Sequence, residues 1–111
     1  ENALISYQEV FGPVIAVYTY RQTDEAIYRA NGLNYVFQAA VFGQNLDELL
    51  HVAHSLNATA VMINDHSAFR VDWMPFGGAR ESGLGLSGIP LAMKELSTEK
   101  LYVMKSPGIR T

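Results

Sequence analysis

The sequence contains no cysteine, which excludes disulfides, thiolate metal sites and cysteine nucleophiles within these 111 residues. Charged residues make up only 17%, below the roughly one quarter of an average globular protein. The formal net charge is -3 and the basic residues form no run, so neither nucleic acid nor an anionic membrane is expected as a partner. No apolar run approaches the roughly twenty residues that cross a bilayer, and no signal-peptide pattern is present. We therefore expect a cytoplasmic protein.

Apolar residues, by contrast, are abundant at 49% of the sequence. The length suits one domain with a continuous core. Because few charges are available to cover the surface, some apolar surface is expected to contact another chain or a missing part of the same chain. The first residues, 1–4, lack an initiator Met and are typical of the middle of a longer chain.

Strand and helix patterns alternate over the first part of the chain. Residues 13–20 are rich in β-branched and aromatic side chains, which indicates a buried strand. Helices are expected over 23–31 and 45–56, where acidic residues and capping side chains begin an apolar stripe. Short apolar runs at 38–42 and 59–64 predict two further strands. The expected fold class is α/β, with a parallel β-α-β-α-β core.

The second part of the chain begins with a long stretch without periodicity, 65–88. Such a long irregular segment is usually functional or disordered. A helix is expected over 89–96, with Pro90 in its first turn, and residues 100–105 resume a strand pattern. The core is therefore predicted to be followed by a C-terminal helix and a C-terminal strand.

Two motifs suggest a ligand site, and both signals are weak. Residues 83–88 match Gly-x-Gly-x-x-Gly, in which glycines let backbone amides approach a pyrophosphate. That motif should follow a strand directly and precede a carboxylate by about twenty residues, and neither condition holds here. We favour a tight loop that backs a helix. His51 and His54 could share a helix face, but no third ligand accompanies them, so no metal site is expected.

Arg70 is the most informative charged residue of the irregular segment. It lies among Phe69, Trp73 and Phe76, where a guanidinium could hold an anionic group inside an aromatic-walled pocket. The alternative is a surface arginine that stacks on Trp73. Residue type alone leaves both interpretations open.

Three segments together resemble the C-terminal region of the aldehyde dehydrogenase superfamily. They are Glu9-Val-Phe-Gly-Pro-Val14, Val61-Met-Ile-Asn64 and Met74-Pro-Phe-Gly-Gly-Ala-Arg-Glu-Ser-Gly-Leu-Gly85, in the family's order and spacing. The resemblance covers essentially the whole chain and implies a C-terminal fragment whose N-terminal part is missing. It further implies that residues 1–99 belong to the catalytic domain and that 100–111 form an oligomerisation strand and tail. A homo-oligomer is then expected.

The resemblance also implies a nicotinamide cofactor, NAD or NADP. In that family the residue matching Glu9 holds the hydroxyls of the nicotinamide ribose, and the residue matching Phe11 lies against the nicotinamide. A carboxylate is a natural bidentate acceptor for a diol, and an aromatic plane limits where the ring rests. The alternative is a capped bend at Gly12-Pro13 with Phe11 in the core.

For the substrate, the resemblance implies a small aldehyde in a tunnel lined by Phe76 and by the loop that carries Phe69. In having an arginine at position 70, the chain resembles the branches of the family that act on phosphate- or phosphonate-bearing aldehydes. We expect Arg70 to bind such an anion. In the family, a cysteine attacks the aldehyde and hydride passes to NAD(P) before the acyl group is hydrolysed to a carboxylate. That cysteine is expected upstream, so these residues include no catalytic residue and should be inactive alone.

Two rival functions belong to other classes. A stand-alone nucleotide-binding module would use residues 83–88 and would bind NAD without the rest of the enzyme. A non-catalytic assembly module would use the apolar strands to dimerise. The dehydrogenase interpretation predicts that cofactor turnover depends on Glu9, whereas the assembly interpretation predicts no such dependence.

Overall fold

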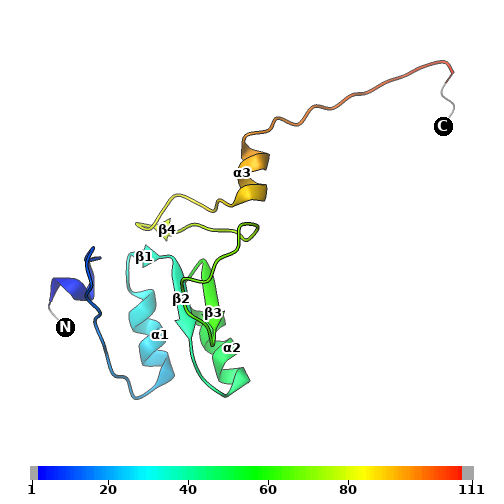
Figure 1. The fold of residues 1–111 in the computed structure, drawn as a ribbon. Coiled ribbons are helices and arrows are strands. Elements are labelled where there is room, and N and C mark those ends of the chain that lie inside the picture. The colour runs from blue at the N-terminus through cyan, green and yellow to red at the C-terminus, as the bar shows by residue number, and fades with distance from the viewer. Residues whose placement is uncertain (1–2, 109–111) are drawn as a thin grey trace.

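The computed structural model describes residues 3–108 and contains three α-helices, one short 3-10 helix and four short strands (Figure 1). In chain order, the elements are η1 (Leu4–Ser6), α1 (Thr23–Asn31), β1 (Tyr35–Val36), β2 (Gln38–Val41), α2 (Leu46–Ser55), β3 (Ala60–Ile63), β4 (Ala79–Arg80) and α3 (Ile89–Glu95). None of the helices in residues 3–108 combines the length and apolar character that crossing a bilayer requires.

The centre of the fold is a parallel pair of strands, β2 and β3, joined by α2. The register runs from Gln38 opposite Ala60 to Val41 opposite Ile63. A parallel pair needs a crossover connection, and α2 provides it while packing against both strands (Figure 1). Leu49 of α2 is the most buried apolar side chain, with 5% of its surface exposed. This unit confirms the predicted strand-helix-strand order over the middle of the chain.

Local side chains explain where the two longer helices begin. The side chain of Asn45 accepts hydrogen bonds from the amides of Asp47 and Glu48, so it caps α2 as the sequence indicates. In α1, Gln22 occupies the cap position without a side-chain hydrogen bond. The hydroxyl of Thr23 instead donates to Glu48 at 3.0 Å, which ties the first turn of α1 to α2.

The predicted strand over residues 13–20 does not form. These residues are exposed and no strand of residues 3–108 pairs with them, so the parallel sheet has two strands and not three. Figure 1 shows the segment, in blue, beside α1 and away from β2 and β3. β-branched and aromatic residues indicate that a segment suits a strand. A strand also needs the backbone of a neighbouring strand for its hydrogen bonds, and the sequence pattern does not show whether one is present.

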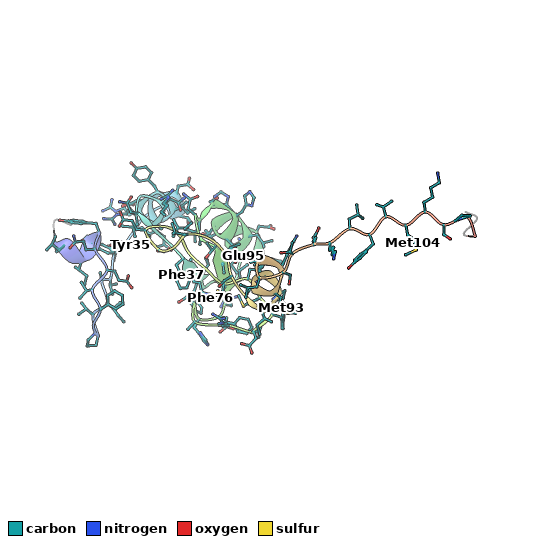
Figure 2. The ribbon with its side chains drawn as sticks, turned by 90° about the horizontal axis from the view of Figure 1, so that it is seen from above. Tyr35, Phe37, Phe76, Met93, Glu95 and Met104 are labelled. Carbon is teal, nitrogen blue, oxygen red and sulfur yellow. The ribbon has the colours of Figure 1, made fainter. Side chains whose placement is uncertain are left out.

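The predicted C-terminal strand over residues 100–105 also lacks a partner. The chain leaves α3 and runs outward in an extended conformation, with the side chain of Met104 far from the body of the fold (Figure 2). Residues 109–111 of the predicted tail lie outside the described residues, as do residues 1–2. The predicted division between 99 and 100 falls within this extended stretch and stays a prediction.

A third difference concerns the segment 65–88, which was predicted to be irregular. It contains β4, which pairs with β1 in antiparallel fashion, Val36 opposite Ala79 and Tyr35 opposite Arg80. A two-residue strand carries no periodicity that a sequence pattern can reveal. This small sheet fixes the irregular segment against the end of α1, and the candidate site depends on it.

Candidate functional site

Arg70 and Phe76 form the centre of the candidate site. The guanidinium carbon of Arg70 lies 3.9 Å from the centroid of the Phe76 ring, within the range of a cation-π contact. The rings of Phe37 and Phe76, both labelled in Figure 2, form a T-shaped pair with a centroid distance of 5.2 Å and an interplanar angle of 82°. The alternative in which Arg70 stacks on Trp73 is wrong. The guanidinium stacks on the ring of Phe76, and the side chain of Trp73 is 74% exposed.

The guanidinium of Arg70 keeps its donors free of carboxylates. Among residues 3–108, Arg70 forms no ion pair and no hydrogen bond, and the ring of Phe76 is its one aromatic partner. Asp65, at the start of the same loop, lies 3.8 Å from the imidazole of His66. A guanidinium carries five N–H donors in a planar fork that matches carboxylate, phosphate and sulfonate oxygens. The arrangement therefore presents a positioned cation that can accept an external anion.

The backbone on either side of Phe76 is fixed by short hydrogen bonds. Phe76 and Ser87 exchange two backbone bonds of 2.8 and 2.7 Å, and the Ser87 hydroxyl donates to the Phe76 carbonyl. The hydroxyl of Thr59 donates to the carbonyl of Gly77 at 2.6 Å. These bonds hold the backbone that carries the ring of Phe76, the aromatic platform on which Arg70 stacks. Thr59 was not among the predicted site residues, because its place at the start of an apolar run does not indicate a contact with the carbonyl of Gly77.

Close packing explains the paired glycines of the Pro-Phe-Gly-Gly segment. A Cβ on Gly77 would overlap the carbonyl oxygen of Gly85, and a Cβ on Gly78 would overlap the carbonyl oxygen of Ser82. Both obstacles are backbone atoms, so no side-chain rotation relieves them. The paired glycines therefore permit the close approach of residues 77–78 to residues 82–85 within this loop.

The far end of the loop is attached to the end of α1. Arg80, at a φ of 54°, donates from Nη1 to the carbonyls of Asn31 at 3.3 Å and Leu33 at 2.8 Å. A cation at the C-terminal end of a helix also complements the helix dipole. The side-chain amide of Asn34 donates to the carboxylate of Glu81 at 3.0 Å. Together with the β1–β4 pair, these contacts hold the second half of the loop.

The Gly-x-Gly-x-x-Gly segment serves packing in this structure. Gly83, Gly85 and Gly88 all have positive φ, and a Cβ on Gly88 would lie 2.8 Å from the carbonyl oxygen of Met74. The amide of Ser87 already donates to Phe76, and Gly88 caps α3. The segment is therefore the tight loop before a helix that the sequence favoured. Its geometry does not support the alternative function as a stand-alone nucleotide-binding module.

Within residues 3–108, no hydrogen bond, ion pair or ring contact joins the remaining predicted site residues to the side chain of Arg70. Phe69 is 44% exposed, and its amide donates to the carbonyl of His66 in a turn. Phe11 is 95% exposed on the N-terminal segment, so it is not a core residue of residues 3–108. Glu9 is exposed two residues away, and the chain bends after it through a bond from the amide of Gly12 to the carbonyl of Val10. The cofactor-binding roles of Glu9 and Phe11 stay predictions.

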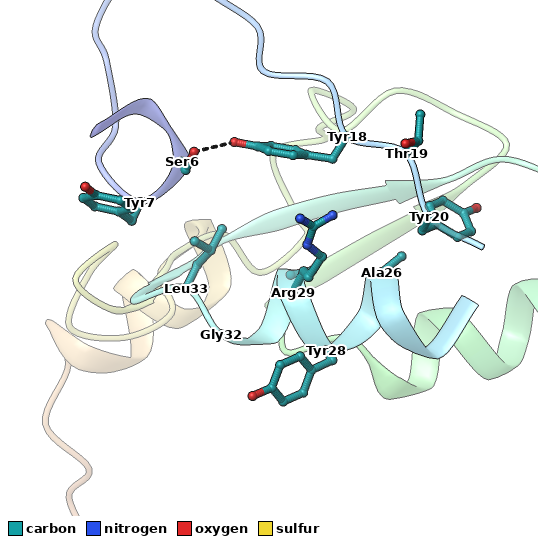
Figure 3. Close-up of a pocket in the computed structure, with 11 residues that line it drawn as sticks. Ser6, Tyr7, Tyr18, Thr19, Tyr20, Ala26, Tyr28, Arg29, Gly32 and Leu33 are labelled. Carbon is teal, nitrogen blue, oxygen red and sulfur yellow. Dashed lines mark hydrogen bonds between the residues drawn. The ribbon is translucent and has the colours of Figure 1, made fainter. Parts of the chain in front are cut away.

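A pocket of about 600 Å³ lies elsewhere, between the N-terminal segment and α1 (Figure 3). Tyr18 lines this pocket, and its hydroxyl donates to the hydroxyl of Ser6 at 2.7 Å. The guanidinium carbon of Arg29 lies 5.2 Å from the centroid of the Tyr18 ring. The walls of the pocket include apolar and tyrosine side chains of α1. Among residues 3–108, no group of three or more acidic, His or Cys side chains is arranged to hold a metal ion.

Comparison with known proteins places these features in a family context. Residues 1–102 match the sequence profile described as the aldehyde dehydrogenase family. Two similar relatives are a lactaldehyde dehydrogenase from Methanococcus maripaludis and a 3-sulfolactaldehyde dehydrogenase from Priestia aryabhattai. Each is 38% identical to this chain over 104 residues, which is 94% of this chain and 22% of the relative. The chain thus spans about a fifth of the length of these relatives.

Solved structures show the same similarity. An aldehyde dehydrogenase from Physcomitrella patens, in complex with the reaction product succinate, has a TM-score of 0.80 and 32% identity over 92% of this chain and 21% of its own. An NADP-dependent glyceraldehyde-3-phosphate dehydrogenase from Bacillus halodurans, in complex with NADP, has a TM-score of 0.78 and 30% identity over 83% and 19%. A Bacillus cereus aldehyde dehydrogenase, in complex with NAD+, has a TM-score of 0.76 and 36% identity over 83% and 18%.

Proposed function

The chain belongs to the aldehyde dehydrogenase family, and we propose that it acts as the substrate-contacting segment of an NAD(P)-dependent enzyme that oxidises an aldehyde to a carboxylate. The observation that carries this proposal is the stack of Arg70 on Phe76, which presents an unpaired guanidinium on a fixed aromatic platform. The chain itself contains no cysteine. The thiol on which the family's chemistry depends must therefore come from the rest of the enzyme.

The cofactor assignment rests on Glu9 and Phe11. The exposed carboxylate of Glu9 has no hydrogen-bonding partner among residues 3–108, and the ring of Phe11 is uncovered, so both side chains can receive a ligand. Their chemistry fits the ribose diol and the ring of a nicotinamide nucleotide. When bound, that nucleotide supplies the hydride acceptor. The relatives solved with NADP and with NAD+ support this cofactor class and leave the choice between the two open.

We propose further that the substrate carries an anionic group, which Arg70 binds. The ring of Phe76 covers one side of the guanidinium, and no residue among 3–108 accepts a hydrogen bond from its N–H groups. Some relatives are named for sulfonate-bearing aldehydes, and others for the uncharged lactaldehyde. The two kinds of aldehyde supply a well-matched pair of probes.

The test uses 3-sulfolactaldehyde and lactaldehyde, which differ only by a sulfonate group on the terminal carbon. In the intact enzyme, Arg70→Ala should lower kcat/KM for 3-sulfolactaldehyde by tenfold or more, since hydrogen bonds to a charged group contribute about 1.5–3 kcal/mol. The value for lactaldehyde should change by less than about threefold, because the lost contact is not made with an uncharged substrate. Equal losses for both aldehydes would contradict an anion-binding role for Arg70.

The exposed C-terminal segment supports a proposed subunit contact. Leu101, Tyr102, Val103 and Met104 form an extended apolar stretch whose backbone has no partner in residues 3–108. Extended chain of this kind gains both hydrogen bonds and apolar burial when it joins the edge of another sheet. We assign it to the interface of a homo-oligomer, and the expected cytoplasmic location of the enzyme is part of the same proposal.

A further inference from the structure

Thr59 directly precedes β3, and its side chain lies between two backbone carbonyl groups. The hydroxyl oxygen is 2.8 Å from the carbonyl oxygen of Phe37 and 2.6 Å from that of Gly77. A threonine hydroxyl has a single proton, so it can donate to one carbonyl at a time. The carbonyl of Phe37 already accepts from the amide of Thr59 at 2.7 Å. The shorter bond, to Gly77, is therefore the one for which the hydroxyl is the necessary donor.

This bond acts on the peptide that carries the aromatic platform. The carbonyl of Gly77 belongs to the residue immediately after Phe76, whose own backbone is paired with Ser87 on the other side. Two independent attachments on opposite sides of Phe76 limit how its backbone can rotate. The ring that lies 3.9 Å from the guanidinium carbon of Arg70 is attached to this restrained backbone.

We infer that Thr59 is a positioning residue for the recognition of an anionic aldehyde, acting through Phe76 on Arg70. The inference rests on the proposed function of Arg70. Thr59 does not touch the guanidinium and is not required to touch the substrate. Its contribution is to keep the platform in one orientation, so that the arginine meets the anionic group without an ordering cost at the moment of binding.

The test removes the hydroxyl and keeps the shape of the side chain. In the intact enzyme, Thr59→Val should lower the ratio of kcat/KM for 3-sulfolactaldehyde to that for lactaldehyde by about five- to tenfold, the loss expected for one hydrogen bond. Thr59→Ser retains the hydroxyl and should keep the ratio within about twofold of the parent enzyme. Thr98→Val makes the same change at an exposed threonine beyond α3, and should leave the ratio unaltered.

A double variant shows whether Thr59 acts through Arg70. If it does, adding Thr59→Val to Arg70→Ala produces no further fall in the ratio, because the group being positioned is already gone. If Thr59→Val is insoluble, Thr59→Ala carries the same expectation, since it also removes the donor. An unchanged ratio in the single Thr59 variant, with a lowered Tm, would assign Thr59 to stability alone and overturn the inference while the role of Arg70 stands. An unchanged ratio in Arg70→Ala would overturn both proposals.

Discussion

Replacing Gly77 by alanine tests whether backbone packing builds the substrate platform. Gly77 does not have a positive φ, so alanine can adopt its backbone conformation and the cost comes from space alone. The new methyl group would overlap the carbonyl oxygen of Gly85, and its next neighbours, at 3.0 Å, are backbone atoms of Gly85 and Leu86. The two segments must move apart, which strains the paired bonds between Phe76 and Ser87. Overpacking costs about 1–3 kcal/mol and each of the two weakened hydrogen bonds about 1 kcal/mol, so we expect a loss of about 3–5 kcal/mol.

The measurement is the free energy of unfolding of the intact enzyme in a denaturant titration, together with kcat/KM. Gly32→Ala is the matched control. Its φ is -73°, and a Cβ there would meet the carbonyl oxygens of Tyr28 and Arg29 at an ordinary 3.5 Å. Because alanine reduces the freedom of the unfolded chain, this variant should be neutral or more stable by up to about 1 kcal/mol. The reasoning fails if the two variants are equally stable, or if Gly77→Ala retains full activity toward an anionic aldehyde.

Two further predictions concern the core and the cofactor. Leu49→Ala should destabilise the intact enzyme by about 2–5 kcal/mol in the same titration, because Leu49 is the most buried apolar side chain between α2 and the parallel strands; a loss below about 1 kcal/mol would show that the helix does not depend on this contact. Glu9→Gln should raise the KM for NAD or NADP by about tenfold through loss of a charge-assisted hydrogen bond, with little change in Tm. An unaltered KM for the nucleotide, as the assembly-module interpretation requires, would remove Glu9 from the cofactor site.

The helices of this chain were predictable because their determinants are local. α1 occupies 23–31 as expected, and α2 begins after Asn45, whose side chain bonds the amides two and three residues ahead. β2 and β3 were also predictable, since short apolar runs on either side of an amphipathic helix favour a parallel pair. In each case the physical cause lies within a few residues of its effect.

The candidate site was predictable by composition and not by geometry. The sequence indicated that Arg70 lies among aromatic residues, but whether it stacks on Trp73 or Phe76 is decided by which ring is held in place. Phe76 is held by Ser87, eleven residues later, and through Gly77 by Thr59, seventeen residues earlier than Phe76. Hydrogen bonds of that span depend on the completed fold. The strand predictions for 13–20 and 100–105 are wrong for a related reason. A strand needs a neighbouring strand to pair with, and the sequence of the segment itself does not show whether one is present.

The distribution of burial explains why these predictions belong to the intact enzyme. Among residues 3–108, the buried apolar side chains are Val36, Leu49 and Met62, while large apolar side chains are exposed along the N-terminal segment, α3 and the C-terminal segment. Folding must offset the conformational entropy of every ordered residue, and three buried side chains cannot do this for a chain of such length. The exposed apolar surface is available for contact with further polypeptide, and the chain spans about a fifth of the length of its relatives. The contacts around Arg70 differ in kind, because Thr59, Ser87 and the close-packed glycines lie within the described segment. We therefore expect this segment to orient the arginine by its own contacts and to depend on the rest of the enzyme for its stability.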